Sequence, residues 1–194
     1  LFLSVGRKAY EAWRNYLENI RLGETVDVAA ISGWESTAIE NHSGIVDALR
    51  GFKADPALMS QSLRPAMAVA KPRKLAYAPG EAAELDLWLF NDTGKPITGE
   101  LVLSLLGPDG AVRAAGRWPV PAHEPDRMSW LVAESVRAPA FEREGRHVIR
   151  LALAGSGEVV SDREVWVAAP QGAPRRKLKI AVSGVALSLR GQLE

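Results

Sequence analysis

The stretch Ala83-Glu-Leu-Asp-Leu-Trp-Leu-Phe90 alternates leucines with polar or aromatic residues at a period of two, which predicts a β-strand with one face in a core. Similar runs follow, and turns rich in Gly, Pro, Asn and Asp separate them. The predicted strands cover residues 67–71, 83–90, 101–106, 112–118, 128–132, 149–153 and 165–167. The pattern therefore predicts a mainly β domain.

About seven short strands in roughly a hundred residues are typical of an immunoglobulin-like β-sandwich. We expect this sandwich over residues 65–169. Within the central strand, Trp88 and Phe90 lie on the face opposite the leucines. Outward aromatic residues favour a surface on which another domain docks, with a second buried face as the alternative.

The N-terminal residues follow a different pattern. Apolar residues at spacings of three and four predict a helix from Val5 to Leu22, which Gly23 ends. The apolar run Val26–Ile31 predicts a parallel strand covered on both faces. A further helix is expected over Ser43–Phe52, and Asp55-Pro56 predicts the start of another over 57–63.

Composition excludes several classes of protein. The chain of 194 residues has no Cys, so disulfides, thiolate nucleophiles and Cys-based metal sites are excluded. Its net charge of +1 gives no electrostatic reason to expect nucleic acid or an anionic membrane as a partner. The three His residues show no paired ligand spacing, so we expect neither a metal nor a cofactor.

A polar stretch after the apolar run carries the functional signal. Ser32-Gly-Trp-Glu35 is followed by Ile39-Glu-Asn-His-Ser-Gly-Ile-Val-Asp47, Arg50 and Lys53-Ala-Asp-Pro56. These residues resemble the last strand and helix of the (β/α)8 barrel in glycoside hydrolase family 2, which includes β-galactosidases, β-mannosidases and β-glucuronidases. The run Leu85-Asp-Leu-Trp-Leu-Phe-Asn-Asp92 is similar to the sandwich domains that flank such barrels.

The resemblance implies a retaining β-glycosidase, which uses two Glu side chains about 5 Å apart as acid/base and nucleophile. In the family these lie on earlier barrel strands, and nothing here matches either motif. We therefore expect no catalytic residue in this chain and no activity from the chain alone.

Three residues are candidates for substrate binding. Trp34 matches the aromatic residue that the last barrel strand supplies in the family, where it would stack on a sugar ring; the alternative is a structural plug at the barrel mouth. Glu35 would accept hydrogen bonds from sugar hydroxyls or pair with a neighbouring cation. His42 lies in a polar Glu-Asn-His loop, which would contact the sugar or serve as a solvated turn.

The expected layout is thus an α/β segment from the end of a (β/α)8 barrel (1–64), the sandwich (65–169), and a linker with the start of a further domain (170–194). Carbohydrate and other domains of the same polypeptide are the expected partners, and a periplasmic or secreted location is favoured over the cytoplasm. The alternatives are a non-catalytic sandwich for domain packing or carbohydrate binding, and an adhesion or receptor sandwich with an unrelated helical prefix.

Overall fold

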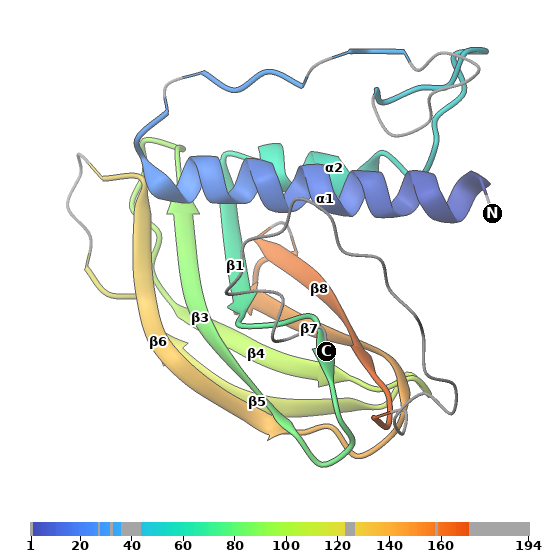
Figure 1. The fold of residues 1–194 in the computed structure, drawn as a ribbon. Helices are drawn as coiled ribbons and strands as arrows, with labels where there is room; N and C mark the ends of the chain where they lie inside the picture. The colour runs from blue at the N-terminus through green and yellow to red at the C-terminus, as the bar shows by residue number, and fades with distance from the viewer. Residues whose placement is uncertain are drawn as a thin grey trace, which may run out of the picture.

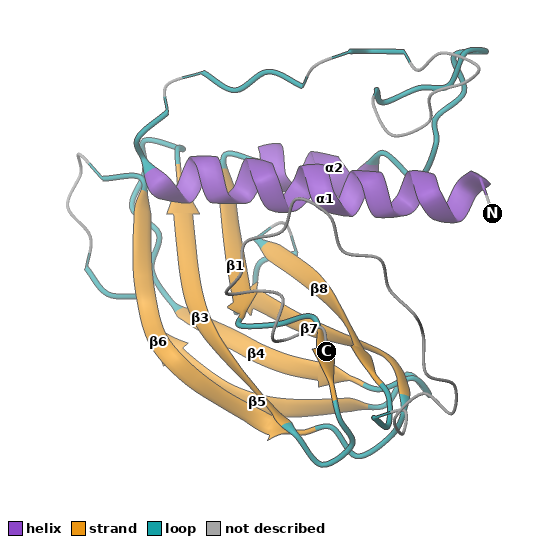
Figure 2. Cartoon of the chain, viewed as in Figure 1, coloured by secondary structure: helices purple, strands orange, loops and turns teal. Residues whose placement is uncertain are grey.

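A computed structural model describes residues 2–26, 28–31, 33–35, 44–122, 127–157 and 159–170. The chain is mainly β, with two sheets and one long helix (Figures 1 and 2). The helical elements are α1 (Phe2–Gly23), α2 (Ala57–Ser60) and the 3-10 turn η1 (Gln61–Leu63). The strands are β1 (Ala66–Pro72), β2 (Ala76–Tyr77), β3 (Ala82–Asn91), β4 (Glu100–Leu106), β5 (Val112–Pro119), β6 (Ser129–Ala140), β7 (Gly145–Leu153) and β8 (Val160–Val167).

The strands form two sheets. The first has the order β1-β3-β6 and the second the order β2-β8-β7-β4-β5. All pairs are antiparallel except β2 with β8, which run parallel. The two sheets meet through one core, because the inward residues of β3, β4 and β7 are all at most 1% exposed: Leu85, Leu87, Leu89, Leu101, Leu103, Leu105, Ile149 and Leu151.

Each predicted run of alternating residues lies within a strand, except that Met128 precedes β6 by one residue, so the strands predicted from the period of two are confirmed. The pattern did not indicate the short strand β2, which has only two residues. It also underestimated β6, whose pairing with β3 is interrupted by register shifts. Ser135 in β6 has a φ of 51°, so the backbone bends there and breaks the alternation that a sequence pattern detects.

Helix α1 lies across one end of the sheets, over the ends of β6, β3 and β1 (Figure 1). It confirms the predicted helix over 5–22 and its end at Gly23. Leu22 packs with Met67, Val69 and Phe90 in a second buried cluster. Phe90 and Trp88 do lie on the outer face of the sheet, as predicted, and α1 is the element that covers Phe90.

Polar contacts fix the C-terminal end of α1 to the sheet. Arg21 Nη1 donates to the carbonyl oxygens of Ser62 (2.7 Å) and Arg64 (2.8 Å). Glu24 Oε1 accepts the backbone N–H groups of Met128 (2.6 Å) and Ser129. The helix is therefore joined both to the chain entering β1 and to the start of β6.

Two predicted elements of the N-terminal segment are wrong. Residues 26 and 28–31 form no strand, and Val28 is 81% exposed. A parallel strand needs neighbours on both sides, and the described residues place none beside this run. The helix predicted over Ser43–Phe52 is replaced, in its described part, by turns and isolated bridges of Val46 with Glu35 and Phe52.

The turn that replaces this helix has a local cause. Asp47 Oδ1 accepts the backbone N–H groups of Leu49 (2.9 Å) and Gly51 (2.8 Å). Arg50 between them adopts a φ of 64°, which an α-helix does not allow. Asp side chains compete with helical hydrogen bonding in this manner, so the local polar contacts override the helical periodicity.

The next helix begins as predicted. Asp55 Oδ1 accepts the backbone N–H of Ala57 (2.9 Å), and α2 with η1 covers 57–63. The division of the chain at 64/65 stays a prediction. The linker and the start of a further domain, expected over 170–194, lie outside the described residues from 171 on.

Candidate functional site

Trp34 combines a fixed backbone with an exposed side chain. Its carbonyl oxygen accepts the N–H groups of Ile45 (2.9 Å) and Val46 (3.1 Å). The residue is 60% exposed, so its indole is accessible from solvent. Because apolar sugar faces pack on aromatic rings, an exposed Trp on a fixed backbone suits a sugar contact.

Glu35, the next residue, is paired with a cation. Its Oε2 lies 3.6 Å from Arg50 Nε, and the side chains are 41% and 80% exposed. A pair this exposed adds little to stability. It does show that the carboxylate has a partner, one of the two roles predicted for Glu35. His42 lies outside the described residues.

The loop that holds Trp34 is attached to α1. The Tyr10 hydroxyl donates to the carbonyl oxygen of Ile45, and Tyr10 is fully buried. One turn earlier, Gly6 contacts the backbone of Lys53, where an added Cβ would lie 2.2 Å from the Lys53 carbonyl oxygen. Residues 44–54 thus rest on the N-terminal half of the helix through one hydrogen bond and one close backbone contact.

The segment between α1 and α2 exposes an unusual number of apolar side chains. Val26, Val28, Leu49 and Phe52 are 47%, 81%, 92% and 54% exposed, in addition to Trp34. A core element would bury such residues, whereas single exposed apolar residues are common on any surface. Exposed apolar side chains are therefore concentrated in this one segment.

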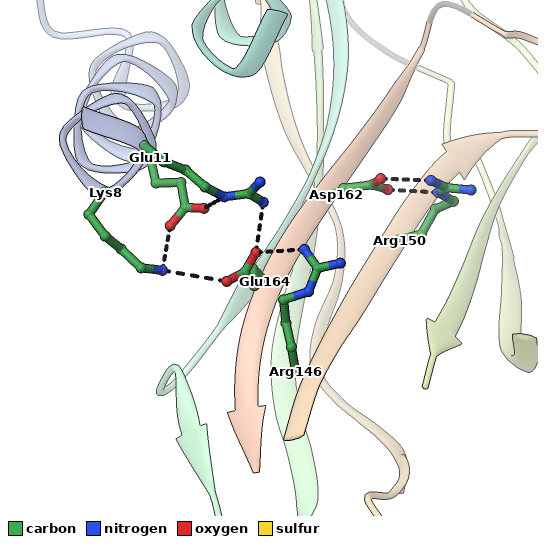
Figure 3. A network of polar contacts seen from close by, with 7 residues as sticks. Lys8, Glu11, Arg146, Arg150, Asp162 and Glu164 are labelled. Atoms are coloured by element: carbon green, nitrogen blue, oxygen red, sulfur yellow. Dashed lines mark hydrogen bonds and ion pairs between the residues drawn. The ribbon is translucent and has the colours of Figure 1, made fainter. Parts of the chain in front are cut away.

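Two carboxylates of the described chain lie close together at the junction of α1 and β8 (Figure 3). Arg7 contacts both Glu11 (3.1 Å) and Glu164 (2.8 Å), and Lys8 Nζ lies 2.8 Å and 3.5 Å from the same two. Arg146 also contacts Glu164 at 3.1 Å.

Glu164 does not have the electrostatics of a glycosidase general acid. Burial raises the pKa of Glu164, but the ion pairs with Arg146, Lys8 and Arg7 outweigh it and hold that pKa below its usual value. A catalytic acid needs the opposite, a raised pKa. Glu164 and Glu11 join α1 to the sheet through their ion pairs with Arg7 and Lys8.

Sequence patterns did not reveal a buried charged group nearby. Arg14, Glu18 and Arg163 are 4%, 3% and 8% exposed. Arg163 Nη2 donates to Glu18 Oε2, and Arg14 Nε lies 3.7 Å from Glu18 Oε1. The i, i+4 spacing of Arg14 and Glu18 was a usable signal for an ion pair on the helix, but nothing in the sequence placed it in the interior.

A groove of about 670 Å³ lies at the end of the sandwich, between the β3–β4 and β5–β6 connections. Its walls combine apolar residues with charged ones: Asp92, Lys95, Ile97, Val120, Arg127 and Trp130. The Asn91 side chain shapes one wall, because Nδ2 donates to the Lys95 carbonyl oxygen (2.7 Å). No motif in the sequence indicated this groove.

Comparisons with known proteins identify no family. No protein-family model and no curated protein matches the chain. Among solved structures, a β-glucosidase from Listeria innocua bound to gluconolactone is 11% identical with a TM-score of 0.38, over 54% of this chain and 16% of that one. An alkylpurine DNA glycosylase from Pseudomonas fluorescens bound to DNA is 15% identical with a TM-score of 0.36, over 59% of this chain and 33% of that one.

A sporulation control protein from Bacillus subtilis, at 15% identity and a TM-score of 0.28, is matched over 55% of this chain and 50% of that one. The chain thus spans half or less of each of these structures. Likeness this weak carries no inference about function. In the described part of the chain, none of the helices has both the length and the apolar character that crossing a bilayer requires.

Proposed function

We propose that the chain is part of a retaining β-glycosidase, to which it contributes the end of a (β/α)8 barrel and a flanking sandwich. The catalytic carboxylates belong to other barrel strands of the complete polypeptide. The role of this chain is to present Trp34 to the substrate and to support the barrel. A periplasmic or secreted location fits this role.

One observation carries the proposal. The apolar run at 26–31 is exposed and unpaired in the described residues, and it leads directly to Trp34, whose backbone is fixed while its indole is accessible. In a barrel, this run would gain strand neighbours and a covering helix layer, and Trp34 would lie at the C-terminal end of the strand. Barrel active sites are built at that end.

The sheet order supports the immunoglobulin-like part of the proposal. An immunoglobulin-like sandwich of the constant type places its first, second, fourth and fifth strands in one sheet and its third, sixth and seventh in the other. If β2 is counted as a short branch of the first strand, β1, β3 and β6 match the first, second and fifth strands, and β4, β7 and β8 match the third, sixth and seventh. The fourth strand, β5, departs from this order, because it pairs with β4 in the second sheet. The Cys pair of antibody domains is absent, and the leucine-rich core takes its place.

The test is the variant Trp34→Ala in the complete natural polypeptide, assayed on aryl β-glycosides. We expect kcat/KM to fall roughly ten- to hundred-fold, by analogy with the loss of an aromatic stacking contact. Trp166→Ala is the matched control, because Trp166 is 49% exposed on β8 and should leave kcat/KM unchanged. A normal specific activity per folded molecule, with only a lower melting temperature, would remove Trp34 from the site.

The groove favours a second candidate function, carbohydrate binding by a non-catalytic sandwich. Its volume lies in the range of small-molecule sites, and Asp92, Thr98 and Arg127 offer hydrogen-bonding groups beside apolar walls. Titration of the chain with neutral oligosaccharides tests this function. Binding that Arg127→Ala abolishes and Trp34→Ala leaves intact would favour the second candidate over the first.

A further inference from the structure

A pocket of about 190 Å³ lies where α1 crosses the boundary between the two sheets. It lies between the helix, β1, the β1–β2 turn and β8, so both sheets contribute to it. Its lining includes Asn15, Glu18, Lys71, Pro72, Leu75 and Arg163. It is separate from Trp34 and from the groove at the β3–β4 connection, with which it shares no lining residue.

The charges at this pocket do not balance. The Glu18 carboxylate contacts two buried guanidinium groups, those of Arg14 and Arg163. Lys71 brings a third cation to the wall. Burying a charge without a counter-charge is unfavourable, so a group of two buried cations and one buried anion favours the approach of a further anion.

Neighbouring carboxylates offset only part of this charge. Glu11 and Asp162 act on Arg14 from a distance, but each is also paired with other cations. Glu11 contacts Arg7 and Lys8. Asp162 forms a two-pronged pair with Arg150, with both N–O distances at 2.7 Å (Figure 3). The positive charge around Arg163 therefore remains available to a ligand.

A second observation concerns hydrogen bonding. The Asn15 side-chain oxygen is buried and finds no hydrogen-bond partner within the described residues, although Asn15 lines the pocket. A buried acceptor left unsatisfied is unfavourable, because it has lost the hydrogen bond that water would donate. A ligand that also carries a hydroxyl group would satisfy it by donating to this oxygen.

We infer that this pocket binds a small hydroxy-carboxylate, in particular a single sugar acid such as a hexuronate. Its carboxylate lies against Lys71 and Arg163, and a ring hydroxyl donates to Asn15 Oδ1. Pro72 and Leu75 form the apolar wall against which a ring packs. The volume lies below that of drug-sized sites, so the pocket suits a single small ligand rather than a chain of sugars. The inference does not depend on the proposed function, because no residue of the pocket contacts Trp34 or a catalytic group.

The test is calorimetric titration of the chain at constant ionic strength with glucuronate, glucose and inorganic phosphate. Glucuronate should bind more tightly than either, since glucose lacks the carboxylate and phosphate lacks the ring. Lys71→Gln should weaken glucuronate binding about tenfold, as expected for the loss of a charge-assisted contact. Lys95→Gln, which removes the same charge from the groove at the other site, is the matched control and should change nothing.

The variant Asn15→Ala tests the hydroxyl contact of the proposed ligand separately from its carboxylate contact. It should weaken glucuronate binding and leave phosphate binding unchanged, and Trp34→Ala should alter neither. Equal binding of glucose and glucuronate would overturn the role of the cations, and equal binding of phosphate would overturn the sugar acid as the ligand. No glucuronate binding, or binding that Lys95→Gln weakens and Lys71→Gln does not, would overturn the site.

Discussion

The guanidinium carbon of Arg21 lies 4.0 Å from the centroid of the Phe90 ring. Phe90 belongs to the outer face of β3, and Arg21 belongs to the last turn of α1. This cation–π contact joins the helix to the sheet whose outward aromatic residues predicted a docking surface. The helical segment and the sandwich are therefore packed together through specific side chains.

We predict that Arg21→Met lowers the free energy of unfolding by about 2 kcal/mol. The substitution keeps an apolar stem over Phe90 but removes the cation–π contact, worth about 1 kcal/mol, and two hydrogen bonds to backbone carbonyl oxygens. Denaturant unfolding measures the change. Arg117→Met is the control, because Arg117 forms an exposed ion pair with Glu100. An equal loss of stability in this variant would show that the Arg21 contacts contribute no more than an exposed ion pair.

At Gly6 we predict that replacement by Ala lowers stability, which is the opposite of its usual effect in a helix. Replacing Gly by Ala inside a helix normally stabilises by roughly 0.5–1 kcal/mol. At Gly6, the new methyl group would lie 2.2 Å from the Lys53 carbonyl oxygen, which is backbone and cannot rotate away. Gly6→Ala should therefore destabilise by about 1–3 kcal/mol, as overpacking does, and increase proteolysis within 44–54.

Gly23→Ala is the matched control for Gly6. Its added Cβ would meet only the Thr25 hydroxyl at 3.5 Å, an ordinary contact. We expect a change within about 0.5 kcal/mol. If Gly6→Ala stabilised the chain as ordinary helix positions do, the contact between α1 and residues 44–54 would not exist in solution.

The attachment of α1 should weaken in acid. Burial raises the pKa of Glu24, but the backbone N–H groups of Ser129 and Met128 outweigh it and lower that pKa, and ion pairs lower the pKa of Glu164. A carboxyl group whose pKa is lower in the folded state stabilises the fold above its ordinary pKa of 4.5. That contribution is lost as the pH falls through the lowered folded-state value.

Melting temperatures measured from neutral pH down to about pH 3 test this expectation. They should decline below the ordinary carboxyl pKa, and Glu164→Gln should flatten part of the decline while lowering stability at pH 7. Glu134→Gln serves as the control, because Glu134 is exposed on β6. An unchanged pH profile in the Glu164 variant would assign the acid sensitivity to other groups.

The sequence predicted the sandwich strands well, because each leucine run that alternates along the chain is also buried on one side, as at Leu85 and Leu103. It predicted α1 for the same reason. It failed at residues 26–31, where a run suited to burial has no neighbouring strands in the described chain. It failed again at Asp47, whose side chain binds the backbone of a turn that periodicity cannot reveal.

Only part of the candidate site could be predicted from the sequence. Trp34 and Glu35 were singled out from their position after an apolar run, and the structure shows one accessible and the other paired with Arg50. The buried group of Arg14, Glu18 and Arg163 joins residues 145 positions apart, so no local pattern could predict it. The groove could not be predicted from a local pattern either, because the β3–β4 and β5–β6 connections that form it are distant in the sequence.

The most direct measurement is hydrolysis of aryl β-galactosides, β-mannosides and β-glucuronides by two samples: this chain alone and the complete natural polypeptide. We predict turnover by the complete polypeptide, with retention of anomeric configuration, and none above buffer by the chain, because the two required carboxylates lie outside it. Turnover by the chain alone that co-purifies with it and scales with its concentration would contradict the account, as would a folded complete polypeptide that hydrolyses no β-glycoside.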